Sequence, residues 1–379
     1  GQNGGPALQP ATYTEDGRPA QFPVGTYSSD FFAQRLIDYL GEEDESDRPF
    51  FAYLAFTAPH WPLQAPKALI AKYQGRYDAG PDALRSARLR RMEELGLLSD
   101  ATLSANLVDL EGWAALSDEQ RKIQSRNMEI YAAMVDSLDQ NVGRVLNHLR
   151  ATGEYDNTVV IFMSDNGAEG IDPGALMKRT SNSTPQAHKA AVLATIELGN
   201  SDLSKMGTTE SFITYGSQWA QAASAPFRRF KGEIEEGGVR VPAFISGPGV
   251  KGQGIIDSPL SVRDIMPTVL DIVGIDVPEA VRGQSLLPFI KGDGADINER
   301  IYGEHVDGSQ AMLRTTEWKC IKSYGSLPYH EKFKITQGNI ELYNLREDPE
   351  ELINVAPEYP ELCGRFSRDM DLWISDRLL

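Results

Sequence analysis

The sequence predicts an α/β protein with a mostly parallel sheet flanked by helices, followed by a small antiparallel sheet with a covering helix. Apolar residues recur with helical periodicity from Asn127 to Ala151, and an all-apolar segment, Thr158–Met163, follows directly. A helix that leads into a fully apolar strand is typical of doubly wound sheets. From about residue 296 the pattern changes to short strand-like segments between turns, and then to a final helix from about Glu358, which predicts the antiparallel part.

The elements before the long helix are predicted to be a loop, a helix and a buried strand. Residues 1–29 are rich in Gly, Pro and Gln, which favours a loop. Ser29 or Asp30 can cap a helix that runs to about Leu40. Phe50–Phe56 is a continuous apolar run, which predicts a buried strand of the parallel sheet with a polar loop at its carboxyl end.

Two longer stretches contain no recognisable catalytic or ligand-binding motif. Residues 67–126 are predicted to be largely helical, and residues 170–222 are predicted to form an insertion over one face of the sheet; we expect the rim of a binding pocket in these segments. A third core strand and a further amphipathic helix are expected at Val239–Ser246 and Asp264–Val273. The sequence thus predicts two domains, an α/β core at 1–295 and an antiparallel-sheet subdomain at 296–379.

Composition and charge exclude several classes of protein. The 379 residues include 37 Lys or Arg and 54 Asp or Glu, so the net charge is −17, and such a surface disfavours nucleic-acid binding. The longest apolar run, Phe50–Phe56, is far shorter than the ~20 residues that span a bilayer, so no membrane span is expected. Two cysteines, Cys320 and Cys363, exclude a disulfide scaffold and a structural zinc site. Localisation and oligomeric state stay open.

Candidate metal ligands follow the apolar segment Thr158–Met163. An adjacent carboxylate and carboxamide, Asp165 and Asn166, stand before Gly167 at the predicted end of this strand. Ligands of open α/β sheets bind beyond the carboxyl ends of strands, and hard oxygen atoms suit Ca²⁺ or Mg²⁺. The alternative is an Asx turn, because Asp-Asn-Gly is also a favourable turn sequence.

Two further segments present polar groups that suit an anionic substrate. His60 lies in Ala58–Pro66, where three prolines in nine residues stiffen the loop, although a single histidine is often structural. Lys231 lies in the glycine-rich segment Phe230–Pro242 and offers an ammonium group suited to phosphate or sulfate. The alternative for this second segment is a surface hairpin with ordinary salt bridges.

Together and in this order, these features closely resemble the sulfatase family, and within it the bacterial-type arylsulfatases of the alkaline-phosphatase superfamily. The resemblance runs over most of the chain. It is carried by Phe50–Pro66, Asn127–Gly170, Trp219–Gly249, Asp264–Leu287 and the C-terminal Glu341–Glu350. It implies an alkaline-phosphatase-like fold and the hydrolysis of a small-molecule sulfate monoester of the aryl type.

The resemblance also implies roles for single residues. Asp165 and Asn166 match the C-terminal pair of the family's metal ligands, usually for Ca²⁺. Lys231 matches a lysine that contacts the sulfate, and His60 matches an active-site histidine near the ester oxygen. The metal and the lysine would neutralise the charge that builds up on the sulfuryl oxygens.

The nucleophile of the family is a formylglycine, made from the Cys or Ser of a Cys/Ser-x-Pro/Ala-x-Arg motif. The resemblance places this motif, a paired Asp-Asp and a further Lys and His upstream of the region that matches Phe50, and the chain lacks them. Ser224–Arg228 has the Ser-x-Pro-x-Arg spacing, but it stands directly before Lys231, where the resemblance assigns another segment. We therefore interpret the chain as the C-terminal part of a sulfatase, and we expect it not to hydrolyse sulfate esters alone.

Two alternative functions remain open from the sequence. Hydrolysis of phosphomonoesters, phosphodiesters or phosphonates is one, because phosphate and sulfate are near-isosteric and a fold does not determine a substrate. The other is a non-catalytic binding protein that retains the pocket. The upstream coding sequence distinguishes them, since a catalytic member would encode the nucleophile motif there.

Overall fold

The computed structural model consists of two compact units that interleave along the chain. Unit 1 comprises Gly1–Leu84, Asp109–Asp156 and Glu169–Ala222, and unit 2 comprises Arg85–Val108, Asn157–Ala168 and Ala223–Leu379. The structure describes residues 13–42, 48–98, 113–171, 190, 193–194, 196–197, 199–251, 254–256, 258–292, 300–305, 308–325 and 338–377. The division into domains 1–295 and 296–379 stays a prediction.

Unit 1 is mainly helical. Its elements are β1 (Tyr13–Glu15), β2 (Arg18–Ala20), α1 (Ser28–Gly41), α2 (Lys67–Lys72), the 3₁₀ helix η1 (Trp113–Ala115) and α4 (Asp118–Thr152). Three more elements lie where the chain passes between the units: α3 (Pro81–Glu94), η2 (Tyr155–Asn157) and α7 (Gly216–Ala223). None of the helices in the described part of the chain combines the length and the apolar character that a membrane span requires.

The long helix α4 is the centre of unit 1, and its ends follow from local sequence. Ser117 Oγ accepts a hydrogen bond from the Gln120 amide, and the Ser117 amide donates to Gln120 Oε1, which makes a capping box. Gly153 ends the helix in the left-handed conformation, with φ of 79°, as its sequence predicts. The helix therefore begins nine residues before the predicted start at Asn127.

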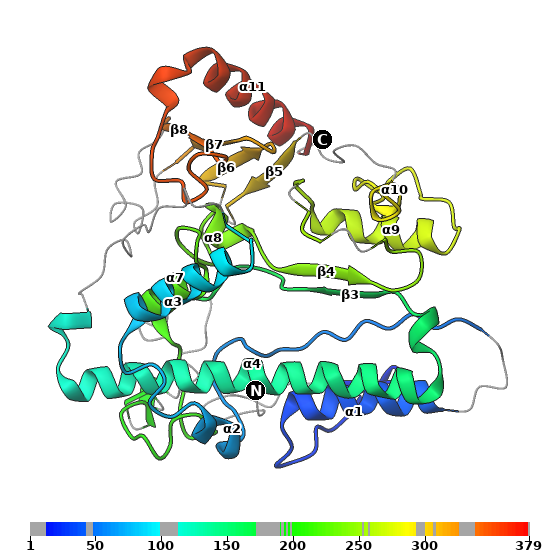
Figure 1. Ribbon diagram of the computed structural model, residues 1–379, viewed down its shortest axis with the longest axis vertical. Coiled ribbons are helices and arrows are strands. Elements are labelled where there is room, and N and C mark those ends of the chain that lie inside the picture. Colours follow the sequence, from blue (N-terminus) through cyan, green and yellow to red (C-terminus); the bar gives the residue numbers. More distant parts are fainter. Residues whose placement is uncertain are drawn as a thin grey trace. The chain divides into compact units, whose positions relative to one another are not determined.

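Helix α1 packs along α4 (Figure 1), but its start differs from the prediction. The helix follows Tyr27, which makes no side-chain cap, so neither Ser29 nor Asp30 is the capping residue. Asp30 instead accepts a hydrogen bond from Asn141 Nδ2 of α4 at 2.7 Å. The carboxylate therefore stabilises the contact between the two helices and not the helix terminus.

The apolar segment Phe50–Phe56 is extended, but it is not the predicted buried strand. Phe51 and Tyr53 are 78% and 85% exposed, and none of the described residues pairs with this segment as a neighbouring strand. Apolar composition favours an extended, buried backbone only where a partner strand supplies the hydrogen bonds. The prediction of a buried strand is wrong for the described structure.

Unit 2 contains both remaining sheets. Its elements are β3 (Val160–Met163), α8 (Glu236–Val239), β4 (Ala243–Ser246), η3 (Val262–Asp264), α9 (Ile265–Ile272), α10 (Leu287–Ile290), β5 (Ile301–Glu304), β6 (Gln310–Arg314), β7 (Trp318–Ser323), β8 (Ile340–Asn344), η5 (Ala356–Glu358) and α11 (Pro360–Arg377). The helix predicted at Asp264–Val273 is confirmed as η3 and α9, although the strand predicted from Val239 begins only at Ala243.

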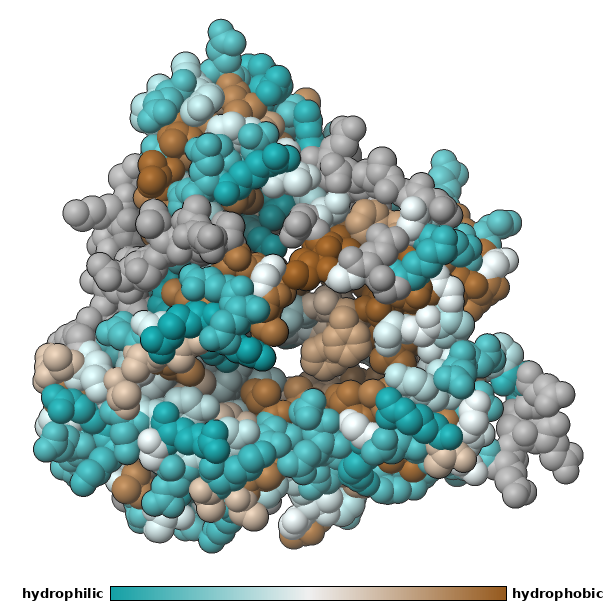
Figure 2. Space-filling model, viewed as in Figure 1, coloured by the Kyte–Doolittle hydropathy of each residue, from teal (hydrophilic) through white to brown (hydrophobic). Residues whose placement is uncertain are grey.

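Strands β3 and β4 pair antiparallel, which corrects the predicted parallel arrangement of these two segments. Val160 lies opposite Ser246, and Met163 lies opposite Ala243. Phe162 and Phe244 stack with ring centroids 5.3 Å apart, and Phe244 is 49% exposed. Figure 2 shows apolar surface around α9 and over β3 and β4. A continuous apolar run is typical of parallel strands that are buried on both faces, but it does not determine the direction of the neighbouring strand.

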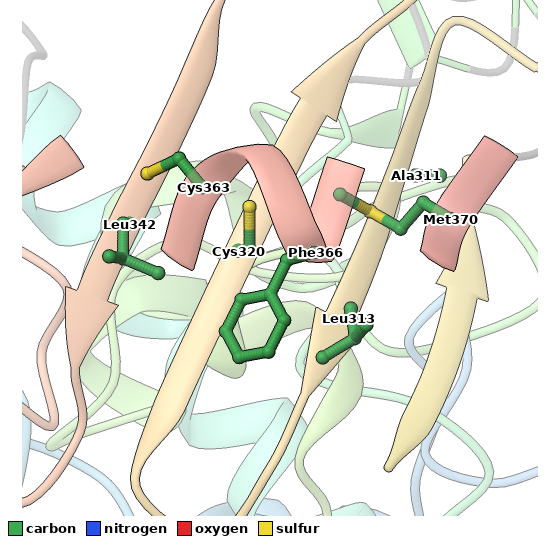
Figure 3. Close-up of a cluster of buried hydrophobic side chains, with 7 residues drawn as sticks. All are labelled: Ala311, Leu313, Cys320, Leu342, Cys363, Phe366 and Met370. Carbon is green, nitrogen blue, oxygen red and sulfur yellow. The ribbon is translucent and has the colours of Figure 1, made fainter. Parts of the chain in front are cut away.

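The C-terminal antiparallel sheet and its covering helix are confirmed. The strands are ordered β5-β6-β7-β8, all antiparallel, and α11 lies across one face of them (Figure 1). Figure 3 shows the core between sheet and helix, where Leu313, Cys320 and Leu342 of the strands face Phe366 and Met370 of α11. The fold class is therefore α/β with a small antiparallel subdomain, as the sequence predicts.

Candidate active site

The loop after β3 carries the predicted metal ligands, and backbone hydrogen bonds hold it against α8 and the strand β4. The Ser164 amide donates to the Pro242 carbonyl oxygen at 3.1 Å, which extends the β3–β4 pairing by one bond. The Gly167 amide donates to the Gly238 carbonyl oxygen at 2.9 Å. The peptide segment that contains Asp165 is therefore bonded to other backbone on both sides.

Glycines are required in this region because backbone packs directly on backbone. A Cβ atom at Gly167 would lie 1.9 Å from the carbonyl oxygen of Gly237. A Cβ at Gly237 would lie 2.2 Å from the Arg228 carbonyl oxygen, and one at Gly238 would lie 2.1 Å from that of Glu233. These distances are far below van der Waals contact, so the three glycines permit the close approach that the sequence suggested.

Asp165 and Asn166 supply donor atoms of the kind that Ca²⁺ prefers. The Asp165 side chain is exposed, and no described residue forms a hydrogen bond or an ion pair with its carboxylate. The Asn166 amide nitrogen donates to the Gly167 carbonyl oxygen at 3.0 Å, so its side-chain oxygen is the atom that could serve the predicted metal. Ca²⁺ takes 6–8 oxygen ligands, and the described residues contain no cluster of three or more His, Cys, Asp or Glu that would hold a metal. The donor types fit the ion, but they are only part of a full ligand set.

Lys231 belongs to the same part of unit 2 as residues 164–168, the loop that carries the predicted metal ligands and that we call the metal loop. Its amide donates to the Ala168 carbonyl oxygen at 2.8 Å, so the segment with Lys231 is bonded directly to the end of the loop that contains Asp165. The Lys231 side chain is half-buried. The structure thus brings Asp165, Asn166 and Lys231 into one bonded backbone region.

His60 lies in unit 1, on a loop that is fixed by its neighbours. The Leu63 amide donates to the Ile213 carbonyl oxygen at 2.9 Å, and the Tyr27 hydroxyl donates to the Gln64 carbonyl oxygen at 3.0 Å. His60 itself is exposed, and its Nδ1 lies 2.7 Å from the Trp61 carbonyl oxygen. Because a carbonyl oxygen can only accept, this contact places a proton on Nδ1 and makes Nε2 the nitrogen that faces other partners.

The serine and cysteine side chains considered as nucleophiles, Ser224, Cys320 and Cys363, are held in structural contacts. The Ser224 hydroxyl donates to the Gly237 carbonyl oxygen at 3.2 Å, a bond within unit 2. Cys320 of β7 and Cys363 of α11 are both buried in the core between the C-terminal sheet and the helix (Figure 3), and burial raises the pKa of the Cys320 thiol to about 12. A thiol with such a pKa is not ionised at neutral pH, so it is a poor nucleophile.

The carboxylates at the start of α8 are buried, which the alternative of a surface hairpin did not anticipate. Glu235 and Glu236 are 3% and 1% exposed. Glu235 Oε1 pairs with Arg229 Nε at 2.8 Å, and Glu236 Oε1 accepts a hydrogen bond from Lys319 Nζ at 3.1 Å. Sequence reasoning missed this arrangement, since only the glycines beside these residues indicate tight packing.

Lys319, Glu236 and Glu351 form a cluster, which we call the buried ion cluster. Lys319 Nζ lies 3.0 Å from Glu351 Oε1, an ion pair without a well-aligned hydrogen bond. Burial disfavours ionisation of both carboxyls, but Lys319 and Arg314 outweigh it at Glu236 and lower its pKa to about 2. At Glu351, burial together with the charges of Glu236 and Glu235 outweighs Lys319 and raises the pKa to about 7. One buried ammonium group therefore pairs with two unequal carboxyls.

Comparison with protein families gives two matches. The sulfatase family model matches residues 3–275, and the model for the C-terminal region of N-sulphoglucosamine sulphohydrolase matches residues 229–371. The first match covers more than half of the chain, including the loop with Asp165, the segment with Lys231 and the loop with His60. The second includes the C-terminal antiparallel sheet.

Known proteins agree with the family match. An uncharacterised sulfatase of Schizosaccharomyces pombe is 38% identical over 96% of this chain and 64% of its own length. An arylsulfatase of Klebsiella aerogenes is 34% identical over 73% of this chain and 57% of its own length. A solved phosphonate monoester hydrolase from Silicibacter pomeroyi shares the fold, with a TM-score of 0.52, 22% identity and coverage of 97% of this chain and 64% of that one. The chain therefore spans less than two thirds of these relatives, and by the family match it belongs to the sulfatase family.

Proposed function

We propose that the protein hydrolyses sulfate monoesters and that Asp165, Asn166 and Lys231 belong to its active site. The observation that carries the proposal is the backbone bonding that joins the metal loop to α8 and to the Lys231 segment, through Gly167 N to Gly238 O and Lys231 N to Ala168 O. Membership of the sulfatase family and the identity to an arylsulfatase support an ester of sulfate as substrate. An aryl ester is the member of this class that we propose.

Lys231 is proposed to neutralise the substrate. A compact ammonium group suits a tetrahedral anion as a point charge, and it stabilises negative charge as that charge develops on the sulfuryl oxygens. The half-buried position of Lys231 supports this role, because charge interactions are stronger where water is partly excluded.

Asp165 and Asn166 are proposed to hold Ca²⁺, with Mg²⁺ as the alternative, through the Asp165 carboxylate and the Asn166 side-chain oxygen. A bound divalent cation supplies positive charge next to the sulfate and so stabilises the transition state. The exposed carboxylate of Asp165, which pairs with no described side chain, supports a role in binding a ligand. The remaining metal ligands and the formylglycine nucleophile are proposed only because the chain belongs to the sulfatase family.

His60 is proposed to assist the leaving group. Its Nδ1 contact with the Trp61 carbonyl oxygen fixes the imidazole tautomer, so Nε2 is the atom that would contact the ester oxygen. When the ring is protonated at Nε2, it can donate that proton to the departing oxygen.

The proposed function is tested with 4-nitrophenyl sulfate as substrate of the full-length protein. We expect turnover with Ca²⁺, loss of turnover after chelation, and recovery when Ca²⁺ is restored. Asp165→Ala should lower metal affinity and turnover together, because it removes the one charged oxygen ligand on this loop. Asp276→Ala, which removes an exposed carboxylate elsewhere in unit 2, is the matched control and should leave both unchanged.

Two results would contradict the proposal. Full turnover after chelation would show that catalysis does not require the metal. Unchanged Ca²⁺ affinity in Asp165→Ala would show that Asp165 is not a metal ligand. The shared fold with a phosphonate monoester hydrolase makes phosphoester or phosphonate hydrolysis the second candidate. An aryl phosphonate or aryl phosphate that is turned over faster than the aryl sulfate would favour it.

A further inference from the structure

The buried ion cluster reaches α8 through its backbone as well as through side chains. Glu351 Oε2 accepts a hydrogen bond from the backbone amide of Glu236 at 2.7 Å, at the first residue of α8. Glu351 is fully buried and has a φ of 56°, a left-handed conformation that is uncommon for a residue with a side chain. The segment with Glu351 is thus held in a specific conformation that directs its carboxylate at α8.

Helix α8 in turn contacts the metal loop without any intervening side chain. Its residue Gly238 accepts the hydrogen bond from the Gly167 amide, and Gly237 lies against Gly167 so closely that no Cβ fits between them. Any displacement of α8 would therefore also move the loop that carries Asp165 and Asn166. Backbone in direct contact leaves no flexible side chain to absorb the shift.

We propose that Glu351 and Lys319 are positioning residues for the metal loop: Glu351 fixes the first turn of α8 by its hydrogen bond to the Glu236 amide, and Lys319 holds both carboxylates in place. This inference rests on the proposed function, because it concerns the same metal loop. The role depends on a hydrogen-bond acceptor at the reach of a glutamate side chain and not on the negative charge itself.

The contrast between three substitutions of Glu351 tests this proposal in the full-length protein. Glu351→Gln retains an oxygen acceptor at the same reach, whereas Glu351→Asp retains the charge and tolerates the left-handed backbone but falls short of the Glu236 amide. Glu351→Ala removes both. We measure Ca²⁺ affinity by isothermal titration calorimetry and kcat and KM for 4-nitrophenyl sulfate.

We expect Glu351→Asp and Glu351→Ala to bind Ca²⁺ about tenfold or more weakly, as for other residues that orient metal ligands. Their kcat should fall more than their KM rises, and Glu351→Gln should restore most of the affinity. Met370→Ala is the matched control, because it opens a cavity in the core beneath α11, away from α8. It should lower thermal stability and leave Ca²⁺ affinity unchanged.

The outcomes separate this inference from the proposed function. Parent-like Ca²⁺ affinity in Glu351→Asp, in a protein whose affinity falls in Asp165→Ala, overturns the positioning role alone. An equal loss of affinity in Met370→Ala also overturns it, since the effect would then be general destabilisation. If Asp165→Ala leaves Ca²⁺ affinity unchanged, the metal site itself is wrong. If Glu351→Ala does not fold, the comparison of Glu351→Asp with Glu351→Gln still decides.

Discussion

The Gly167 amide donates a hydrogen bond to the carbonyl oxygen of Gly238 at 2.9 Å, and a Cβ on Gly167 would lie 1.9 Å from the carbonyl oxygen of Gly237. The metal loop therefore has no room for any side chain at residue 167. We expect Gly167→Ala to displace the loop or α8 and to lower both Ca²⁺ affinity and kcat, because the added methyl group meets backbone that cannot move independently. Calorimetric titration with Ca²⁺ and the aryl sulfate assay measure the two effects.

Gly143→Ala is the matched control for this substitution. Gly143 lies inside α4, and a Cβ there would have no neighbour within 4 Å. Alanine should raise the unfolding free energy by about 0.5–1 kcal/mol, because glycine in a helix interior is unfavourable. Parent-like activity in Gly167→Ala would show that the loop tolerates a shift, and would contradict its tight coupling to α8.

Substitutions of Lys231 test whether its positive charge stabilises the transition state. We expect Lys231→Ala to cost about 3 kcal/mol of activation free energy, on the order of 100-fold in kcat, by analogy with the loss of one oxyanion donor. Lys231→Arg should recover part of this loss, since a planar guanidinium does not replace a compact ammonium. Lys251→Ala, at an exposed lysine of the same unit, is the control for loss of charge. Equal kcat values for Lys231→Ala and Lys251→Ala would exclude a catalytic role.

The substitution His60→Ala tests whether this histidine donates a proton to the leaving group. We expect His60→Ala to lower kcat more for phenyl sulfate than for 4-nitrophenyl sulfate, because the poorer leaving group depends more on a proton donor. The melting temperature should change little, since the ring is exposed. A drop in melting temperature of several degrees with unchanged kcat would instead identify a structural histidine.

Local patterns predicted those elements that depend on neighbours in sequence. The periodicity of α4, the left-handed cap at Gly153 and the short segments of the C-terminal sheet are all properties of local sequence. The direction of the β3–β4 pair and the exposure of Phe50–Phe56 depend on partners far along the chain. A run of apolar residues does not identify its partner, so these two predictions failed.

The candidate site also combines features that local sequence predicts with features that depend on distant partners. A strand end followed by Asp165, Asn166 and glycine pointed to ligand chemistry, and the structure places Lys231 next to that loop. The buried ion cluster was not predictable, because Glu236 meets Lys319 and Glu351 across 83 and 115 residues of chain. A single glutamate in a sequence is most often a solvated surface residue, and only its partners make burial tolerable.

The buried ion cluster predicts how stability changes with pH. The pKa of Glu351 is raised to about 7 in the folded protein, from 4.5 in the unfolded chain, so between these values the folded state binds the extra proton. Its contribution to stability is present below about pH 4.5 and is lost as the pH rises through about 7. Glu236 has a pKa lowered to about 2, so its contribution to stability is instead lost as the pH falls, and only below pH 4.5.

Glu351→Gln cannot titrate, so relative to the parent it should gain about 3 kcal/mol of unfolding free energy between pH 5 and pH 8, measured by urea denaturation. The exposed Glu358→Gln controls for the loss of one carboxylate, and the same difference from the parent at pH 5 and pH 8 would show that Glu351 does not titrate in this range.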